Sequence, residues 1–144
     1  MSVALATISD TALSLDAHLD AVDDDRAGAV TTFLGRVRDH DPDAAGEVVA
    51  LEYSSHPDAE RILRDLAERA VAAGVSGEAI IAVSHRIARL PVGPAAVIVA
   101  VAAAHRDEAF VVCREMIESI KRELPVWKRQ VEADGTTAWK GIGG

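Results

Sequence analysis

The chain has 144 residues, of which 49% are apolar, with a formal net charge of −8 and one cysteine. The length and the apolar content predict a single domain over residues 1–144, and the acidic balance argues against nucleic acid or an anionic membrane as a partner. No apolar run is long enough to cross a membrane, and the lone Cys113 cannot form an internal disulfide, so the sequence favours a reducing cytoplasm and excludes a zinc site built from several thiolates.

The first half of the chain predicts three strands and two helices. Alternating apolar and β-branched residues mark the strands, whereas apolar residues at helical spacing mark the helices. Ser14-Leu15-Asp16 fits the start of the first helix, and Pro57 fits the first turn of the second. In chain order we expect a strand at 3–8, a helix at 13–22, a strand at 28–37, a polar loop at 40–46, a strand at 47–54 and a helix at 57–73.

The second half predicts three strands and a long amphipathic helix. The run at 79–90 is expected to be one strand that can carry a bulge, and 95–104 is apolar enough to be a central strand covered on both faces. The other expected elements are a turn at 91–94, a helix that starts at 105–106 and reaches about 124, a strand at 126–132, a turn at 133–136 and a loose end at 142–144. This order of elements predicts an α+β sandwich with a mostly antiparallel sheet and three helices.

Three side chains within apolar segments have structural interpretations. Cys113 falls in the apolar stripe of the long helix together with Phe110, which favours a packed thiol over a nucleophile. His85, alone in an apolar strand, is interpreted as a hydrogen-bonded structural histidine. Trp127 is interpreted as part of the core rather than as a stacking platform.

Basic residues are the candidates for chemistry, since the sequence contains no Ser-His-Asp elbow, phosphate loop or metal-ligand spacing. His105 and Arg106 stand where a strand meets a helix, and the unpaired N–H groups of a helix start help to bind phosphate or carboxylate. Lys121 lies at the border of the apolar stripe, from which it can direct its ammonium into a cleft. Lys128 follows in an extended segment and projects opposite Trp127. The alternatives are a solvated helix cap and ordinary surface lysines.

A row of positive or polar groups also marks the end of the strand at 28–37. Arg36, Arg38 and His40 are two residues apart, so an extended chain projects all three to one face. The alternative is a solvated strand end. We expect five groups to converge on one hollow that binds an anion, stabilises developing negative charge and supplies a lysine for proton transfer or covalent attachment. These groups are Arg38, His105, Arg106, Lys121 and Lys128.

Five stretches of the chain resemble the large, catalytic subunit of molybdopterin synthases, in the same order and spacing. They are GAVTTFLGRVRDHD, LEYSSHP, SHRIARLPVG, AAAHRDEAF and IKRELPVWKR. The resemblance implies an α/β hammerhead-like fold and a sulfurtransferase that converts cyclic pyranopterin monophosphate to molybdopterin. It also implies a homodimer with a small ubiquitin-like carrier at each end, whose thiocarboxylated Gly-Gly terminus supplies the sulfur. No metal or other cofactor is implied at this step.

The resemblance also assigns roles to matching residues. It implies that activity depends on Lys121 and Lys128. The matching residues of the pocket for the pterin phosphate are Arg38, His105 and Arg106, with Arg36 and His40 as weaker candidates. One difference lies in the tail, because some relatives carry a longer basic segment after the position of Trp139 that reaches the neighbouring subunit's pocket. Here only Lys140 remains as a basic residue after Trp139, before Gly143-Gly144.

Two other functions fit the same basic residues. A non-catalytic docking module would use Arg38 and Lys128 only to hold the acidic surface of a ubiquitin-like carrier. Calorimetry separates the two, because such an adaptor binds the carrier and not the pterin. A Schiff-base enzyme acting through Lys121 on a small carbonyl compound would instead give an adduct that borohydride traps.

Overall fold

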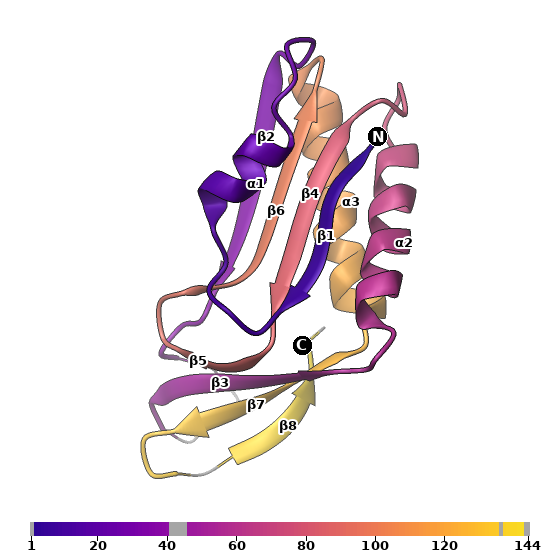
Figure 1. Ribbon diagram of the computed structural model, residues 1–144. Helices are drawn as coiled ribbons and strands as arrows, with labels where there is room; N and C mark the ends of the chain where they lie inside the picture. Colours follow the sequence, from indigo (N-terminus) through magenta and orange to yellow (C-terminus); the bar gives the residue numbers. More distant parts are fainter. Residues whose placement is uncertain (1, 41–45, 136, 143–144) are drawn as a thin grey trace.

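The computed structural model describes residues 2–40, 46–135 and 137–142, which form two four-stranded sheets and three helices. The strands are β1 (Val3–Ser9), β2 (Ala29–Arg36), β3 (Val48–Ser55), β4 (Ile80–Arg86), β5 (Ala88–Pro91), β6 (Ala95–Ala103), β7 (Val126–Glu132) and β8 (Thr137–Gly141). The helices are α1 (Leu15–Ala21), α2 (Ala59–Ala72) and α3 (Arg106–Glu123). The first sheet stands upright in Figure 1, and the second lies across its lower end. Most of the loop expected at 40–46, and the end of the tail at 143–144, lie outside the described residues.

The prediction of a mostly antiparallel arrangement is confirmed. The first sheet has the strand order β1-β4-β6-β2, in which only β1 and β4 pair in parallel. The second sheet has the order β5-β3-β7-β8, and all of its pairs are antiparallel. The predicted start of the first helix is also confirmed, since the Ser14 hydroxyl accepts a hydrogen bond from the Ala17 N–H at 3.1 Å.

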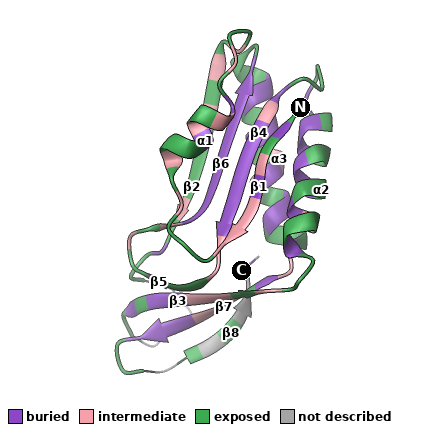
Figure 2. Cartoon of the chain, in the orientation of Figure 1, coloured by how far each residue is buried: buried purple, intermediate pink, exposed green. Residues whose placement is uncertain are grey.

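Strand β6 is the centre of the first sheet and is covered on both faces, as predicted. Val97, Val99 and Val101 belong to the main core, together with residues of α2 and α3. On the other face, Ala100 and Ala102 join a smaller cluster with Val22, just after α1. The alternation of larger and smaller apolar side chains therefore lets helices pack on both faces of this sheet. Figure 2 shows β6 and β4 as the most continuously buried strands.

Helix α3 buries a stripe that is rotated slightly from the one expected. Ala109, Val112, Met116 and Ile120 lie fully inside, and Cys113 is 5% exposed. Burial raises the pKa of the Cys113 thiol to about 11, so the prediction of a packed thiol is confirmed. The prediction that Phe110 belongs to this stripe is wrong, since Phe110 is 58% exposed. No helix within the described ranges is long and apolar enough to cross a membrane.

The strand expected at 79–90 divides into β4 and β5, which belong to different sheets. Ala88 has a φ of +70°, a left-handed conformation that side chains other than glycine rarely adopt, and it interrupts the extended run. Strand β4 continues the first sheet beside β6, whereas β5 pairs with β3 in the second sheet. The prediction of one strand is therefore wrong, because each half finds a different partner.

Three further details differ from expectation. Helix α2 begins at Ala59 with Asp58 as its N-cap, so Pro57 precedes the helix rather than opening it. No strand was expected after 126–132, yet β8 pairs with β7. The expected loose end is also wrong for Ile142, which is buried in the main core. Pairing and burial by distant segments override the weak local preference of these residues.

His85 joins the two sheets through a buried aromatic contact. Its side chain is 2% exposed, and its Nδ1 lies 2.7 Å from the Arg86 carbonyl oxygen. Its ring meets the ring of Tyr53 edge-on, with centroids 5.1 Å apart and planes at 75°. Because His85 belongs to β4 and Tyr53 to β3, the contact crosses from one sheet to the other. The interpretation of His85 as a hydrogen-bonded structural histidine is confirmed.

Glu108 ties the loop before β4 to the start of α3. The buried carboxylate accepts hydrogen bonds from the Ser76 hydroxyl at 2.8 Å and from the Ser76 N–H at 3.3 Å. Gly74 permits this approach, since a Cβ at that position would lie 2.5 Å from a Glu108 oxygen. Glu108→Ala should lower the free energy of unfolding by about 1–3 kcal/mol, because it removes two hydrogen bonds to a charged carboxylate. Urea denaturation measures this loss.

The matched control is Asp107→Ala, which removes an exposed carboxylate from the same helical turn. It should cost less than about 1 kcal/mol, the usual contribution of one acidic residue near a helix N-terminus. Equal losses in the two variants would contradict an anchoring role for the contact with Ser76.

Acid should weaken the fold through His85. Burial lowers its pKa from the ordinary value of 6.5 to about 4; the hydrogen bond with Arg86 opposes this change and the charge of Lys121 adds to it. Between these two pH values the unfolded chain binds a proton that the folded chain does not. The contribution of His85 to stability is therefore present above pH 6.5 and is lost as the pH falls toward 4, to the extent of about 3 kcal/mol.

Urea denaturation at a series of pH values checks this prediction. His85→Asn cannot titrate in this range, so its free energy of unfolding should depend less on pH than that of the wild type. Parallel pH profiles for the two proteins would contradict the assignment of this acid sensitivity to His85.

Candidate active site

One pocket brings together both predicted lysines and the basic groups at the end of β2. It encloses about 280 Å³ between the end of β2, the inner face of the second sheet and the last turn of α3. Five of its side chains are cationic or imidazole groups, and none of the described residues that line it is a carboxylate. The lining residues are Arg36, Arg38, His40, Val48, Leu51, Tyr53, Lys121, Lys128 and Gln130. Such a lining attracts an anion.

The pairing of β3 with β7 forms the floor of this pocket. Tyr53 lies opposite Lys128 across the antiparallel ladder, and Leu51 lies opposite Gln130. Directly opposed residues project from the same face of a sheet, and alternate residues share that face. Four pocket residues therefore come from two adjacent cross-strand pairs, and the register of the ladder places Lys128 beside the Tyr53 ring.

The opposite face of the second sheet carries the residues between these pairs. Arg129 forms an ion pair with Glu52 and lies over the Trp139 ring, with 4.9 Å from the guanidinium carbon to the ring centroid. Trp127 precedes Lys128 and so projects away from the pocket, with 43% of its surface exposed. The prediction that Trp127 belongs to the core is wrong, because the alternation that turns Lys128 inward turns its neighbour outward.

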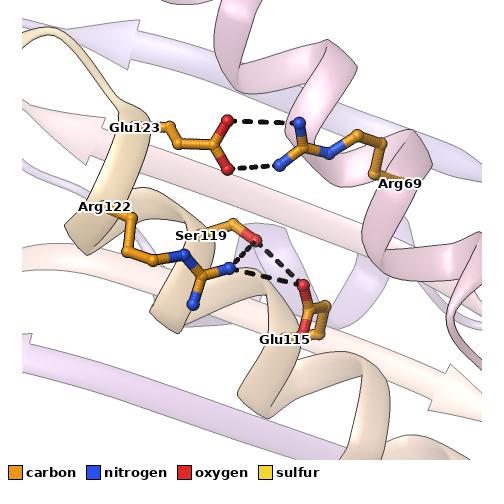
Figure 3. Close-up of polar contacts among 5 residues, drawn as sticks. All are labelled: Arg69, Glu115, Ser119, Arg122 and Glu123. Carbon is orange, nitrogen blue, oxygen red and sulfur yellow. Dashed lines mark hydrogen bonds and ion pairs between the residues drawn. The ribbon is translucent and has the colours of Figure 1, made fainter.

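The last turn of α3 delivers Lys121 to the pocket and is fixed by ion pairs on its other sides. Arg69 of α2 forms a two-pronged ion pair with Glu123 (Figure 3). Arg122 points back along α3 toward Ser119, at 3.4 Å, and Glu115, at 3.6 Å (Figure 3). The chain neighbours of Lys121 are therefore engaged elsewhere, and their charges are partly compensated outside the pocket.

The charge of Lys128 acts on Lys121 within the pocket. Loss of surrounding water lowers the pKa of Lys121, and the positive charge of Lys128 lowers it further. Lys121 still reaches solvent, so a small anion can approach it. An ammonium group with a lowered pKa releases its proton more easily than an ordinary lysine, which suits it to proton transfer.

The end of β2 contributes the remaining basic groups. Arg36, Arg38 and His40 all line the pocket, which agrees with the prediction that their spacing directs them to one side. The Arg36 Nε donates a hydrogen bond to the Gly93 carbonyl oxygen at 2.7 Å. Gly93 has a φ of +113°, which a residue with a side chain would adopt only under strain. The loop after β5 therefore holds Arg36 in position.

His105 and Arg106 lie far from this pocket within the same chain. They stand at the start of α3, and Lys121 follows Arg106 by fifteen residues, which is about 22 Å along a helix axis. Neither residue lines the pocket, and Figure 1 shows the two ends of α3 at opposite ends of the first sheet. The expectation that all five predicted groups converge within one chain is therefore wrong, because a continuous helix separates them.

Two polar pocket residues were missed as site candidates from the sequence. Tyr53 was placed only in the strand expected at 47–54, and Gln130 only in the strand expected at 126–132. The alternation of β3 correctly indicates that Leu51 and Tyr53 share a face. Only the register between β3 and β7 reveals that this face also carries the lysine of β7.

Known proteins match the chain in sequence. The family model described as MoaE protein matches residues 8–123. The chain is 36% identical to the molybdopterin synthase catalytic subunit 1 of Mycobacterium tuberculosis, over 93% of this chain and 88% of that protein. It is also 36% identical to the molybdopterin synthase catalytic subunit of a Nostoc species, over 91% of this chain and 78% of that protein.

The fold matches as well. A crystal structure of molybdopterin synthase from Staphylococcus aureus has a TM-score of 0.84 at 27% identity, and the match covers 93% of this chain and 95% of that one. This similarity confirms the predicted α+β class with three helices and mostly antiparallel sheets. The extent of the family match and the identity to its members agree with the five stretches noted in the sequence, and the chain belongs to the MoaE protein family.

Proposed function

We propose that this chain is the catalytic subunit of a molybdopterin synthase. It converts cyclic pyranopterin monophosphate to molybdopterin, with sulfur from the thiocarboxylated Gly-Gly terminus of a small ubiquitin-like carrier. The observation that carries this proposal is the pocket in which Lys121 and Lys128 lie together with no carboxylate among the described lining residues. Relatives named as catalytic subunits of this synthase support the activity and imply a partner subunit.

The charge of the pocket suits both reactants. The pterin carries a phosphate, and the thiocarboxylate of the carrier is an anion, so each enters a site whose cationic groups attract it. Arg38 can present two parallel N–H groups to phosphate oxygens, which a lysine cannot do. We assign phosphate binding to Arg38, with Arg36 and His40 beside it at the same end of β2.

The lysines act where sulfur is transferred. Lys121, with its lowered pKa, is assigned to proton transfer at the pterin side chain. Lys128 stabilises negative charge as each bond to sulfur forms, and it attracts the carboxylate left on the carrier after delivery. Both roles require the groups to stay within one small pocket, as the β3–β7 register and the last turn of α3 provide.

A dimer of the chain can bring His105 and Arg106 of one copy to the pocket of the other. Strand β2 is an edge of the first sheet, and large apolar side chains on it and on the neighbouring helix are exposed. These side chains are Val30, Phe33, Leu34, Phe110 and Val111. An edge strand with exposed apolar groups is suited to cover by a second chain. We therefore assign the homodimer contact to β2 and the exposed side of α3.

The direction in which β2 runs determines which residues of the second copy would lie near the pocket. Ala29 pairs with Ala103, near the start of α3, and Arg36 pairs with Ala95, at the pocket end of the sheet. A two-fold axis through the middle of β2 would bring the start of one copy beside the end of the other. His105 and Arg106 would then complete the phosphate site in the partner's pocket.

Lys121→Ala and Lys128→Ala should each lower the rate of dithiolene formation by about a hundredfold or more while the fold survives, because each removes a group that acts on developing charge. The assay combines the purified chain, the thiocarboxylated carrier and cyclic pyranopterin monophosphate. Arg122→Ala is the matched control, since Arg122 adjoins Lys121 but contacts Glu115 outside the pocket. Normal conversion by both lysine variants would contradict the assigned chemistry. Calorimetric binding of carrier without pterin would instead indicate a docking module.

Mixing two inactive variants tests the shared site. If the pocket takes Lys121 from one copy and Arg106 from the other, then a mixed dimer of Lys121→Ala and Arg106→Ala keeps one intact site. An equal mixture that exchanges subunits freely should recover about a quarter of wild-type activity. Absence of recovery, with mixed dimers verified by mass spectrometry, would contradict the cross-subunit assignment and leave the lysine test unaffected.

A further inference from the structure

Tyr53 is an aromatic side chain in the wall of the lysine pocket. It lies opposite Lys128 in the β3–β7 ladder, and Lys121 lines the same pocket. Burial raises the pKa of the Tyr53 hydroxyl to about 12, so the phenol stays neutral at physiological pH. A neutral phenol offers a flat apolar surface together with one hydroxyl that can donate or accept a hydrogen bond.

His85 supports the Tyr53 ring from outside the pocket. It is almost fully buried and is absent from the pocket lining, and its ring meets that of Tyr53 edge-on. The Arg86 carbonyl oxygen at 2.7 Å can only accept a hydrogen bond, so the neutral ring carries its proton on Nδ1. Burial and this bond both hold the imidazole, and the edge-on contact between the two rings limits the tilt of Tyr53.

We propose that Tyr53 contacts the pterin ring of the substrate and that His85 is a positioning residue that holds Tyr53 at the pocket wall beside the two lysines. This inference rests on the proposed function, since it names further residues of the same site. A pterin is a flat heteroaromatic bicycle, and an aromatic wall with one polar group suits such a ligand. The basic groups then hold the phosphate, and Tyr53 orients the ring.

The two-sheet architecture explains why a positioning residue is needed. Tyr53 and Lys128 belong to the second sheet, whereas Lys121 arrives on α3, which packs against the first. His85 also belongs to the first sheet and lies near enough to Lys121 for that charge to lower the pKa of its imidazole. The contact between His85 and Tyr53 therefore aligns the pterin wall with a lysine from the other layer, without adding charge to the pocket.

Two substitutions separate the ring of His85 from its hydrogen bond. His85→Asn keeps a donor for the Arg86 carbonyl and removes the ring, whereas His85→Phe keeps a ring and removes the donor. In the reconstituted synthase, His85→Asn should raise KM for the pterin about tenfold and change kcat by less than about threefold, the pattern of a lost ground-state contact. His85→Phe should restore KM to within about threefold of the wild type. Arg89→Ala, on the outer face of the second sheet, serves as the control.

A double-mutant cycle tests whether His85 acts through Tyr53. Tyr53→Leu alone should raise KM about tenfold, and adding His85→Asn to it should raise KM by less than about twofold more. Independent, multiplying effects would overturn the positioning role, as would a wild-type KM for His85→Asn or equal impairment by Asn and Phe. If His85→Asn does not fold, Tyr53→Leu decides, because an unchanged KM in that variant overturns the substrate contact.

The same assay separates this inference from the proposed function. If the wild-type chain does not convert the pterin with a thiocarboxylated carrier, the proposed function fails. If the wild type converts it and the variants at 53 and 85 keep its KM, only the inference fails.

Discussion

The register between β3 and β7 is the constraint on which the candidate site depends. Tyr53 lies opposite Lys128, and Leu51 lies opposite Gln130, so four pocket side chains share one face. A slip by one residue would send Lys128 to the outer face and bring Trp127 into the pocket. On the outer face, the ion pair of Arg129 with Glu52 favours the observed register. Contacts on the outer face of the sheet thus help to determine which side chains face the pocket on the inner face.

The electrostatics of the pocket oppose those of the whole chain. The protein carries a net charge of −8, yet the described lining of this pocket has basic groups and no carboxylate. The acidic residue nearest to Lys121 in sequence, Glu123, pairs with Arg69. A small anion is therefore attracted locally, while the acidic remainder of the surface disfavours large polyanions. This division of charge suits the phosphorylated substrate that we propose.

Much of the fold follows from local patterns in the sequence. The continuous apolar run of β6 and the helical spacing of apolar residues in α3 are strong local signals. The structure confirms both elements. The break at Ala88 and the strand β8 were not predicted. Each depends on pairing with another strand, which the local sequence does not indicate. The outward turn of Trp127 was missed for a related reason, since an aromatic residue in a strand can serve either face.

The candidate site was predictable in composition and not in geometry. Basic residues at unusual places drew attention to both lysines and to the end of β2, and these do share a pocket. His105 and Arg106 belong to the same chemical class but stand at the far end of α3. Residue type alone cannot reveal that separation. Tyr53 shows the opposite case, because it was not predicted as a site residue and yet lines the pocket.

The strand order of the first sheet also bears on how the chain folds as it leaves the ribosome. Strand β6 lies between β4 and β2, so β2 has no neighbour in its sheet until the chain has been made beyond residue 103. The strands that pair with β3, which are β5 and β7, are likewise synthesised after it. Contacts of such long sequence separation make folding slow and leave apolar strands uncovered during synthesis. Strand β2 therefore has no strand partner until most of the chain has been synthesised.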